Sequence, residues 1–218
     1  MNNCTLENSR TTTSGGALYV SGGRVDARST SFLRNEAVVS GGAISIHGGF
    51  ALFDSCLMED NVASRDGGAL HVRNGTVLLR ARTLLTRNRA ARGRSIMLLG
   101  GRVEYQLPCP LGRWINAAAG QGSMNVGSGA TELDFPYACA PGLFGSSYRI
   151  EVQSSPQCAG ECEVGHFCPV GTVTPRPCGP GNFCPGYDIS GRGATAELPC
   201  MCEETTTLDM PLNTDLVI

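Results

Sequence analysis

The sequence predicts an all-β chain, with a right-handed parallel β-helix of about four coils followed by a small, disulfide-rich, loop-dominated module. The first observation is a glycine pair that recurs every 26 residues, beginning at Gly15, Gly41 and Gly67, with Gly93-Arg94 keeping the spacing. The second is a concentration of cysteines in the other half of the 218-residue chain. Self-similarity at a short fixed period is typical of stacked structural units rather than of a single globular core.

Within each 26-residue unit, apolar and polar residues alternate in three short runs. Alternation with a period of two places every second side chain on one face of a β-strand. Three strands per unit form one coil, and stacked coils place equivalent residues about 4.8 Å apart. We expect this β-helix over residues 1–107, with interior columns at Leu18, Ile44, Leu70 and Ile96, at Val25, Ala51, Val77 and Val103, and at Leu6, Phe32, Met58 and Leu84.

Glycine and asparagine are expected at the turns of this β-helix. Glycine accepts positive φ and close backbone approach without a steric penalty. Asn8, Asn35, Asn61 and Asn88 precede the glycine pairs by five to seven residues. Stacked asparagine side chains can hydrogen-bond to one another along an axis, so the four residues predict a ladder.

Two short motifs carry a resemblance to a known family. The sequences GGAI at 41–44 and FLRN at 32–35 match the GGAI and FxxN motifs of chlamydial polymorphic outer membrane proteins. More widely, residues 1 to about 107 resemble the pectin-lyase-like right-handed β-helix superfamily. The resemblance implies the fold and leaves the activity open, because one fold hosts many activities.

The composition changes after the repeats. Residues 108–138 are rich in Pro, Gly and Ala and are expected to form a connector, in which Trp114 covers the open end of the β-helix or stacks on a sugar. Residues 139–202 contain a C-x5-C-x9-C-x5-C pattern with GHFCP and GNFCP sequences. This region resembles the cysteine-rich repeat of ephrin-receptor-like extracellular regions, which implies a spacer or interaction module. Residues 203–218 are expected to be a flexible tail.

The cysteine-rich region has few apolar residues, so we expect disulfides to stabilise it. The alternative is zinc, but only Cys158/Cys162 and Cys200/Cys202 approach the spacing of zinc-ligand pairs. Cys4 and Cys56 fall in one interior column, about 9.6 Å apart, and are expected to be free thiols. The disulfide candidates, whose pairing the sequence leaves open, are Cys109, Cys139, Cys158, Cys162, Cys168, Cys178, Cys184, Cys200 and Cys202.

A disulfide-rich module predicts an extracellular or cell-surface protein. Asn3 and Asn74 lie in N-x-S/T sequons and are candidates for glycosylation. Residues 1–20 lack the pattern of a signal peptide, and no apolar run approaches the length of a membrane helix. We therefore expect a fragment of a larger repeat protein, with the signal sequence and any membrane anchor outside it.

Charge is distributed unevenly along the chain. Residues 1–113 contain 14 arginines and 8 acidic residues, whereas residues 114–218 contain 3 arginines and 11 acidic residues. A cluster near the last repeat predicts an anion or glycan patch, with a solvated loop as the alternative. Its members are Arg80, Arg82, Arg87, Arg89, Arg92 and Arg94. No aromatic pattern or recognition helix accompanies them, so a nucleic-acid partner is not expected.

No residue pattern predicts a catalytic site, a metal site or a cofactor. His47 and His71 are expected on the surface, and the outward column of Arg28, Asp54 and Arg80 favours a surface ion-pair ladder. We therefore expect a non-catalytic adhesion or recognition segment with glycans or surface proteins as partners. Its contact rows would be Tyr19, Ser45 and His71, and Ser21, His47 and Arg73.

The alternative function is a fragment of a pectin-lyase-like carbohydrate-active enzyme. Relatives in that superfamily bind Ca²⁺ through outward Asp residues and use an arginine as the base. A stacked cluster of Asp residues is not seen in this sequence, and calcium requires several converging oxygens. The sequence therefore favours recognition over catalysis.

Overall fold

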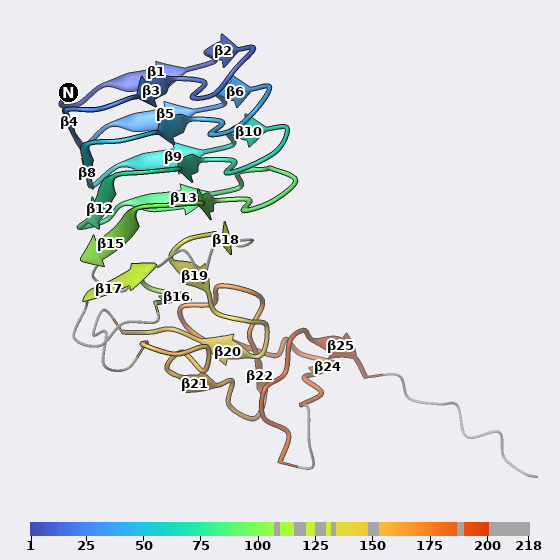
Figure 1. Ribbon diagram of the computed structural model, residues 1–218. Coiled ribbons are helices and arrows are strands. Elements are labelled where there is room, and N and C mark those ends of the chain that lie inside the picture. Colours follow the sequence, from blue (N-terminus) through green and yellow to red (C-terminus); the bar gives the residue numbers. More distant parts are fainter. Residues whose placement is uncertain are drawn as a thin grey trace, which may run out of the picture.

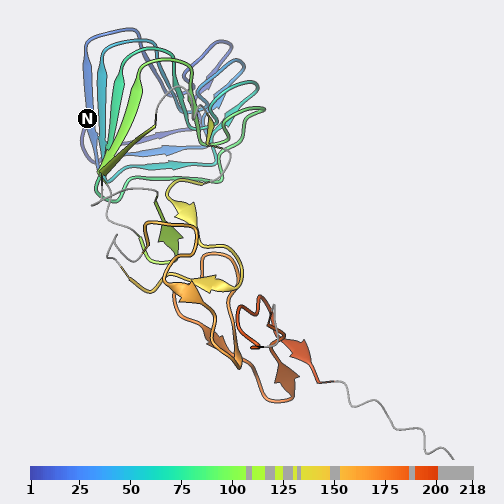
Figure 2. The same ribbon diagram turned by 60° about the horizontal axis from the view of Figure 1, so that its bottom comes forward.

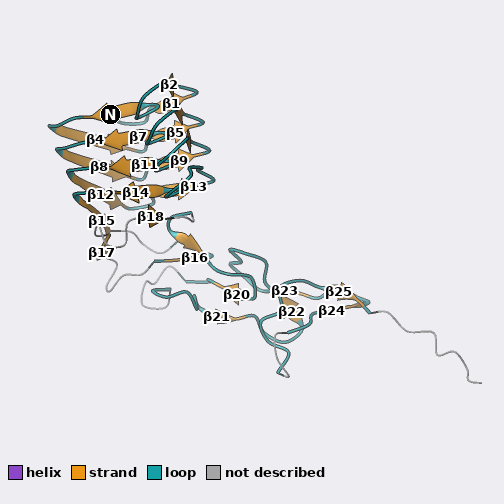
Figure 3. Ribbon diagram, turned by 45° about the vertical axis from the view of Figure 1, so that its right-hand side comes forward, coloured by secondary structure: helices purple, strands orange, loops and turns teal. Residues whose placement is uncertain are grey.

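The computed structural model describes residues 1–106, 110–115, 121–124, 130–131, 134–147, 153–186 and 190–200. All secondary structure in this described part is β-strand, and residues 1–106 form a parallel β-solenoid of about four coils (Figure 1). The predicted all-β, coiled architecture is therefore confirmed. Figure 3 shows the strands of successive coils lying one above another along the solenoid.

Three parallel sheets form the walls of the solenoid, and each coil contributes one strand to each sheet (Figure 2). The first sheet contains β1 (Thr5–Glu7), β5 (Ser31–Leu33), β9 (Leu57–Glu59) and β13 (Leu84–Thr86). The second contains β3 (Leu18–Val20), β7 (Ile44–Ile46), β11 (Leu70–Val72) and β14 (Ile96–Leu98). The third contains β4 (Arg24–Arg28), β8 (Phe50–Asp54), β12 (Thr76–Arg80) and β15 (Arg102–Gln106). A smaller ladder contains β2 (Arg10–Thr11), β6 (Glu36–Ala37) and β10 (Val62–Ala63).

The core lies inside the coils and is built from the predicted columns. Ile44, Leu70 and Ile96 stack in register on β7, β11 and β14, and all are buried. Phe32 and Phe53 meet edge to face across the interior, with ring centroids 6.0 Å apart. Strands of three to five residues suffice here because their apolar side chains point into a shared interior and stack on those of the neighbouring coils.

The two glycines of each pair are required for two different structural reasons. Gly41 has φ of +67°, a conformation that L-residues with a side chain rarely adopt. Gly42 has ordinary φ, but a Cβ there would overlap the carbonyl oxygen of Gly68 in the next coil and the backbone of Val62. In the fourth coil Arg94 replaces the second glycine, because an antiparallel strand rather than another parallel coil follows it.

Substitution of Gly42 by Ala is expected to lower the free energy of unfolding by about 2–4 kcal/mol, because the clash is with backbone that cannot rotate away. The matched control is Gly22→Ala, since a Cβ at Gly22 would meet no atom within 4 Å. We expect that control to stay within about 0.5 kcal/mol of the wild type. Urea denaturation measures both variants, and equal midpoints for the two would contradict the close-approach argument.

A buried asparagine ladder joins three coils. The Asn61 side-chain oxygen accepts from the Asn35 backbone N–H at 2.9 Å and from the Asn35 side-chain amide at 3.0 Å. Its own amide donates to the Phe32 carbonyl at 2.9 Å and to the Asn88 side-chain oxygen at 3.0 Å. The predicted ladder is thus confirmed for three of its members.

Asn8 does not belong to the ladder, so that part of the prediction is wrong. Ser9 holds the equivalent position, and its backbone N–H donates to the Asn35 side chain at 3.0 Å. Asn8 is exposed one residue earlier, in the left-handed turn conformation with φ of +54° that Arg34 shares. The sequence spacing could not distinguish the ladder position from the turn position beside it.

Replacement of Asn61 by Ala is expected to cost about 3–5 kcal/mol of stability, because it leaves the Asn35 backbone N–H and the Phe32 carbonyl of the preceding coil without their partner. Asn2→Ala removes an exposed asparagine side chain and should cost less than about 0.5 kcal/mol. Chemical denaturation of the two variants side by side checks the difference. A loss below 1 kcal/mol for the ladder variant would show that the ladder is not a main source of stability.

The turn between β12 and β13, which begins the fourth coil, contains one residue more than the equivalent turn between β8 and β9. Leu85, rather than Leu84, pairs with Met58 and is fully buried, so the predicted place of Leu84 in the interior column is wrong. Thr83 occupies the position of Cys56 and accepts a hydrogen bond from the Cys56 backbone N–H at 3.2 Å. The next turn is one residue shorter, which restores the 26-residue glycine spacing at Gly93.

The C-terminal end of the solenoid is covered by antiparallel pairing from the predicted connector. Strands β17 (Gln121–Met124) and β18 (Ala130–Thr131) pair with β15 and β14. Phe135 exchanges two backbone hydrogen bonds with Leu85, and its buried ring meets Tyr105 edge to face at 5.2 Å. Phe135 therefore covers the core, while Trp114, expected in that role, packs on Tyr137 at 4.7 Å.

Beyond the solenoid, four similar units follow one another. In each, a glycine with positive φ is followed two residues later by an aromatic residue in a two-residue strand. These strands are β16 (Arg113–Trp114), β20 (Leu143–Phe144), β22 (His166–Phe167) and β24 (Asn182–Phe183). Each pairs antiparallel with a short partner, namely β19 (Tyr137–Ala138), β21 (Gly160–Glu161), β23 (Arg176–Pro177) and β25 (Leu198–Pro199). The first unit, at 110–115, lies within the segment that the sequence assigned to the connector.

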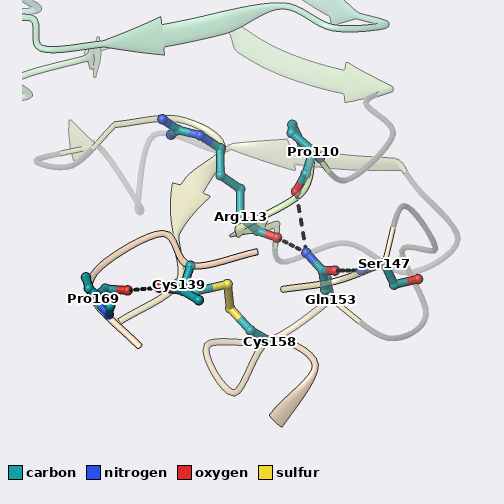
Figure 4. The surroundings of a disulfide bond; sticks show 8 residues. Pro110, Arg113, Cys139, Ser147, Gln153, Cys158 and Pro169 are labelled. Carbon is teal, nitrogen blue, oxygen red and sulfur yellow. Dashed lines mark hydrogen bonds between the residues drawn. A yellow bond between two sulfur atoms is a disulfide. The ribbon is translucent and has the colours of Figure 1, made fainter. Parts of the chain in front are cut away.

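Among the described residues, three disulfides stabilise these units, joining Cys139 to Cys158, Cys162 to Cys168 and Cys178 to Cys184. Buried Gln153 ties the first disulfide loop to the preceding unit, since its amide donates to the carbonyls of Pro110 and Arg113 (Figure 4). The side-chain oxygen of Gln153 accepts from the Ser147 backbone N–H at 2.7 Å. Disulfides of this density are typical of an oxidising compartment.

Of the three remaining cysteines that the structure describes, two follow the prediction. Cys4 and Cys56 are free thiols, and burial raises the pKa of the Cys56 thiol. Cys200, a disulfide candidate, is exposed and unbridged within the described residues. Cys109 and Cys202 lie outside the described residues.

Candidate functional site

A groove of about 330 Å³ lies on the outer face of the β3–β7–β11–β14 sheet. One wall comes from the turns that precede the glycine pairs, and the other from the residues that follow the strands. The lining residues are Ser14, Val39, Ser40, His47, Arg65, Asp66, His71, Arg73 and Leu99. Most of them recur at the 26-residue spacing, so the groove is a product of the same stacking that builds the core.

His71 lies at the floor of this groove, with Ser45 beside it. They are directly paired on neighbouring strands, and the Ser45 hydroxyl lies 3.1 Å from His71 Nδ1. Both residues are buried, which contradicts the expectation that His71 is a surface histidine. Burial, assisted by the positive surroundings, lowers the pKa of His71 to about 4, so the ring is neutral near pH 7.

His47 stands beside this floor, one coil earlier. Its ring lies 4.9 Å from that of Tyr19 and 5.7 Å from that of His71, measured between centroids. Burial, followed by the charge of Arg73, lowers the pKa of His47. Its Nε2 atom is buried and makes no hydrogen bond within the described residues. A buried ring nitrogen without a partner is uncommon in folded proteins, and bound water, an ion or a functional role commonly explains one.

The carboxylate in the groove is already neutralised. Asp66, with a side chain 3% exposed, pairs with Arg92 at 2.7 Å and lies 3.9 Å from Arg65. Arg65 and Arg73 remain exposed at the rim. The net charge of the groove is therefore positive, and its polar floor consists of neutral imidazole and hydroxyl groups.

Stability is expected to fall as the pH is lowered from about 6.5 to about 4, in part because of His71. Its pKa is lower in the folded protein than its ordinary value of 6.5, so the unfolded chain binds more protons in this range. The contribution is at most about 3 kcal/mol. Denaturation midpoints of the wild type and of His71→Gln, measured from pH 4 to 7, isolate this contribution.

The variant should show a shallower dependence of stability on pH than the wild type. His166→Gln, which removes a histidine from the cysteine-rich region, is the matched control. Parallel curves for the wild type and His71→Gln would argue against burial of the neutral ring.

The predicted arginine patch is divided among different surroundings. Arg92 pairs with Asp66 from the equivalent position of the next coil, and Arg87 pairs with Glu59 at 2.8 Å and Asp60 at 3.0 Å. Arg87, Arg89 and Arg94 line a second cavity below the last coil. Arg80 and Arg82 are exposed at a different corner.

The remaining predicted residues occupy ordinary surface positions. Arg28, Asp54 and Arg80 share a register on β4, β8 and β12 as expected, but no ion pair joins them among the described residues. Asn3 and Asn74 are both exposed. The described residues include no group of three potential metal ligands, and none forms a helix that could cross a membrane.

The contact rows predicted from the sequence include Ser45, His47, His71 and Arg73, but they leave out the wall of the groove beside these residues. Ser14, Ser40 and Asp66 recur every 26 residues just before the glycine pairs, and this column is the signal by which the sequence could have predicted the wall.

Comparisons with protein-family models, with curated proteins and with solved structures found no match to this chain.

Proposed function

We propose that this chain is a non-catalytic, extracellular or cell-surface recognition segment that binds an acidic glycan in the groove on the β3–β7–β11–β14 sheet. The observation that carries the proposal is the unpartnered, buried Nε2 of His47 in a groove rimmed by Arg65 and Arg73. Guanidinium groups form strong, charge-assisted hydrogen bonds with carboxylate and sulfate groups. A sugar hydroxyl can bond to the neutral imidazole, whichever nitrogen carries its proton.

The size and surroundings of the groove agree with a short stretch of glycan. A volume of about 330 Å³ lies at the lower end of the range for small-ligand sites. Tyr19, which is 51% exposed and whose ring is tilted by 43° to that of His47, offers an aromatic face to a sugar ring beside the groove. Side chains of successive coils would thus contact successive parts of an extended ligand.

The compartment and the wider role form part of the same proposal. Three disulfides support secretion, and exposed Asn3 and Asn74 would then be available for glycosylation. The resemblances to pectin-lyase-like β-helices and to ephrin-receptor-like cysteine-rich repeats agree with an adhesive segment carried on a disulfide-stabilised stalk. Such a segment would belong to a larger repeat protein.

The non-catalytic role is supported by the state of the carboxylate in the groove. Glycoside hydrolysis commonly uses two carboxyl groups, one as acid and one as base or nucleophile. Asp66 is the carboxylate among the residues that line the groove, and it is engaged by Arg92 at 2.7 Å. This arrangement favours binding without bond cleavage.

Binding of an oligogalacturonate tetramer and of a heparin-derived tetrasaccharide, measured by calorimetry on the full chain, tests the proposal. Arg73→Gln is expected to weaken binding of the preferred oligosaccharide about 10-fold, the effect of one charge-assisted hydrogen bond. His47→Ala should also weaken it. Arg28→Gln, an exposed arginine on β4, is the matched control and should leave binding unchanged.

Two results would contradict the proposal. Equal losses for Arg73→Gln and Arg28→Gln would mean that the oligosaccharide senses only overall charge. Release of shorter or unsaturated sugars, followed by chromatography after long incubation, would replace the recognition role with an enzymatic one.

A further inference from the structure

The four units beyond the solenoid are joined by a backbone contact that repeats from one unit to the next. Each contact begins at the residue directly after the aromatic residue, whose backbone N–H donates to a carbonyl in the loop between the two strands of the following unit. These bonds run from Ile115 to Gln153 at 3.2 Å, from Gly145 to Thr172 at 2.9 Å and from Cys168 to Ala194 at 2.9 Å. Three units are thus each covered by the unit that follows.

A second hydrogen bond completes the contact where the second and third units are covered. A glycine directly precedes the residue that supplies the carbonyl, and its N–H donates back to a cysteine carbonyl of the covered unit. These bonds run from Gly171 to Cys139 at 2.8 Å and from Gly193 to Cys162 at 2.9 Å. The docked segment is therefore a Gly-Thr dipeptide in one case and a Gly-Ala dipeptide in the other.

The last unit, formed by β24 and β25, has the same backbone groups without the cover. Cys184, directly after the aromatic residue, holds the position of Cys168 in the third unit. Cys178 likewise holds the position of Cys162. In the described part of the chain, neither the Cys184 N–H nor the Cys178 carbonyl makes a hydrogen bond. The last unit therefore presents one free donor and one free acceptor at the places where the preceding units are docked.

The exposure of the last unit agrees with the missing cover. Both cysteines of the third unit's disulfide are fully buried, whereas both cysteines of the last unit's disulfide are half-buried. Phe183 is 47% exposed, and Leu198, directly opposite on β25, is 45% exposed. Directly opposite residues of an antiparallel pair have their side chains on the same face. The face of the last unit thus combines unpaired backbone groups with an exposed apolar pair.

We propose that this open face binds an extended segment of another protein, in which a glycine is followed by a small residue and flanked by apolar residues. The glycine N–H would donate to the Cys178 carbonyl, and the carbonyl of the next residue would accept from the Cys184 N–H. Strand addition of this kind takes its affinity from main-chain hydrogen bonds and its specificity from side-chain contacts, here with Phe183 and Leu198. The face shares no residue with the groove of the solenoid, so the proposal is independent of glycan binding.

Titration of the isotope-labelled, disulfide-bonded full chain with the peptide acetyl-Pro-Val-Gly-Thr-Val-amide, the sequence of residues 169–173, tests the proposal by NMR. We expect the amide signals of Phe183, Cys184 and Leu198 to shift and to reach saturation. The same peptide with N-methylglycine lacks the donor and should bind about 5-fold more weakly. Phe183→Ala should weaken binding by a similar factor, because it removes apolar contact. The matched control is Val164→Ala, which truncates a 62% exposed residue of the third unit and should bind like the wild type.

Three results would overturn the proposal. Signals of the last unit that do not move with the peptide would show that its face does not take such a segment. Equal binding of the two peptides would mean that apolar contact alone holds them. Movement of the same signals when the chain is concentrated without peptide would assign the face to a second copy instead. Thermal unfolding of both variants separates a loss of binding from a loss of folding.

Discussion

Successive coils approach each other so closely at the glycine pairs that only backbone fits between them, and the rest of the molecule depends on this contact. A Cβ at Gly42 would overlap the Gly68 carbonyl oxygen, so the spacing at this corner is set by the backbone itself. With the corner fixed, the strands of all three sheets remain in register from coil to coil. The Asn35–Asn61–Asn88 ladder fixes a second corner through buried hydrogen bonds rather than through contact.

The groove and the lining of the second cavity both follow from that stacking. The groove exists because residues before each glycine pair and residues after each second-sheet strand stack into two parallel walls. Enclosure by those walls, rather than contact with the core, removes His71 from solvent and keeps its ring neutral. Arg94 lines the second cavity because the stacking of parallel coils ends there, which leaves room for a side chain at position 94.

The 26-residue period and the alternation of apolar residues suffice to predict the solenoid, its three sheets and most of its core. The same reasoning misplaces Leu84, because an insertion at one corner and a deletion at the next cancel within the period. It also places His71 in solvent, since an outward side chain looks exposed when the flanking turns are not yet positioned. The sequence does not predict the role of Phe135, because the segment that contains it carries no repeat. It does not predict the disulfide partners either, because cysteine spacing alone leaves many pairings open.

The second and third coils have equal length, and the same backbone contacts join each to its neighbours. The unit between Gly42 and Gly67 therefore behaves as an interchangeable module, whereas the fourth coil, with its shifted corner and its arginine, is a terminal piece. Duplication of that inner unit would lengthen the solenoid by about 4.8 Å and extend the groove by one coil. The length of the groove is thus a quantity that gene duplication can adjust in steps, without redesign of either end.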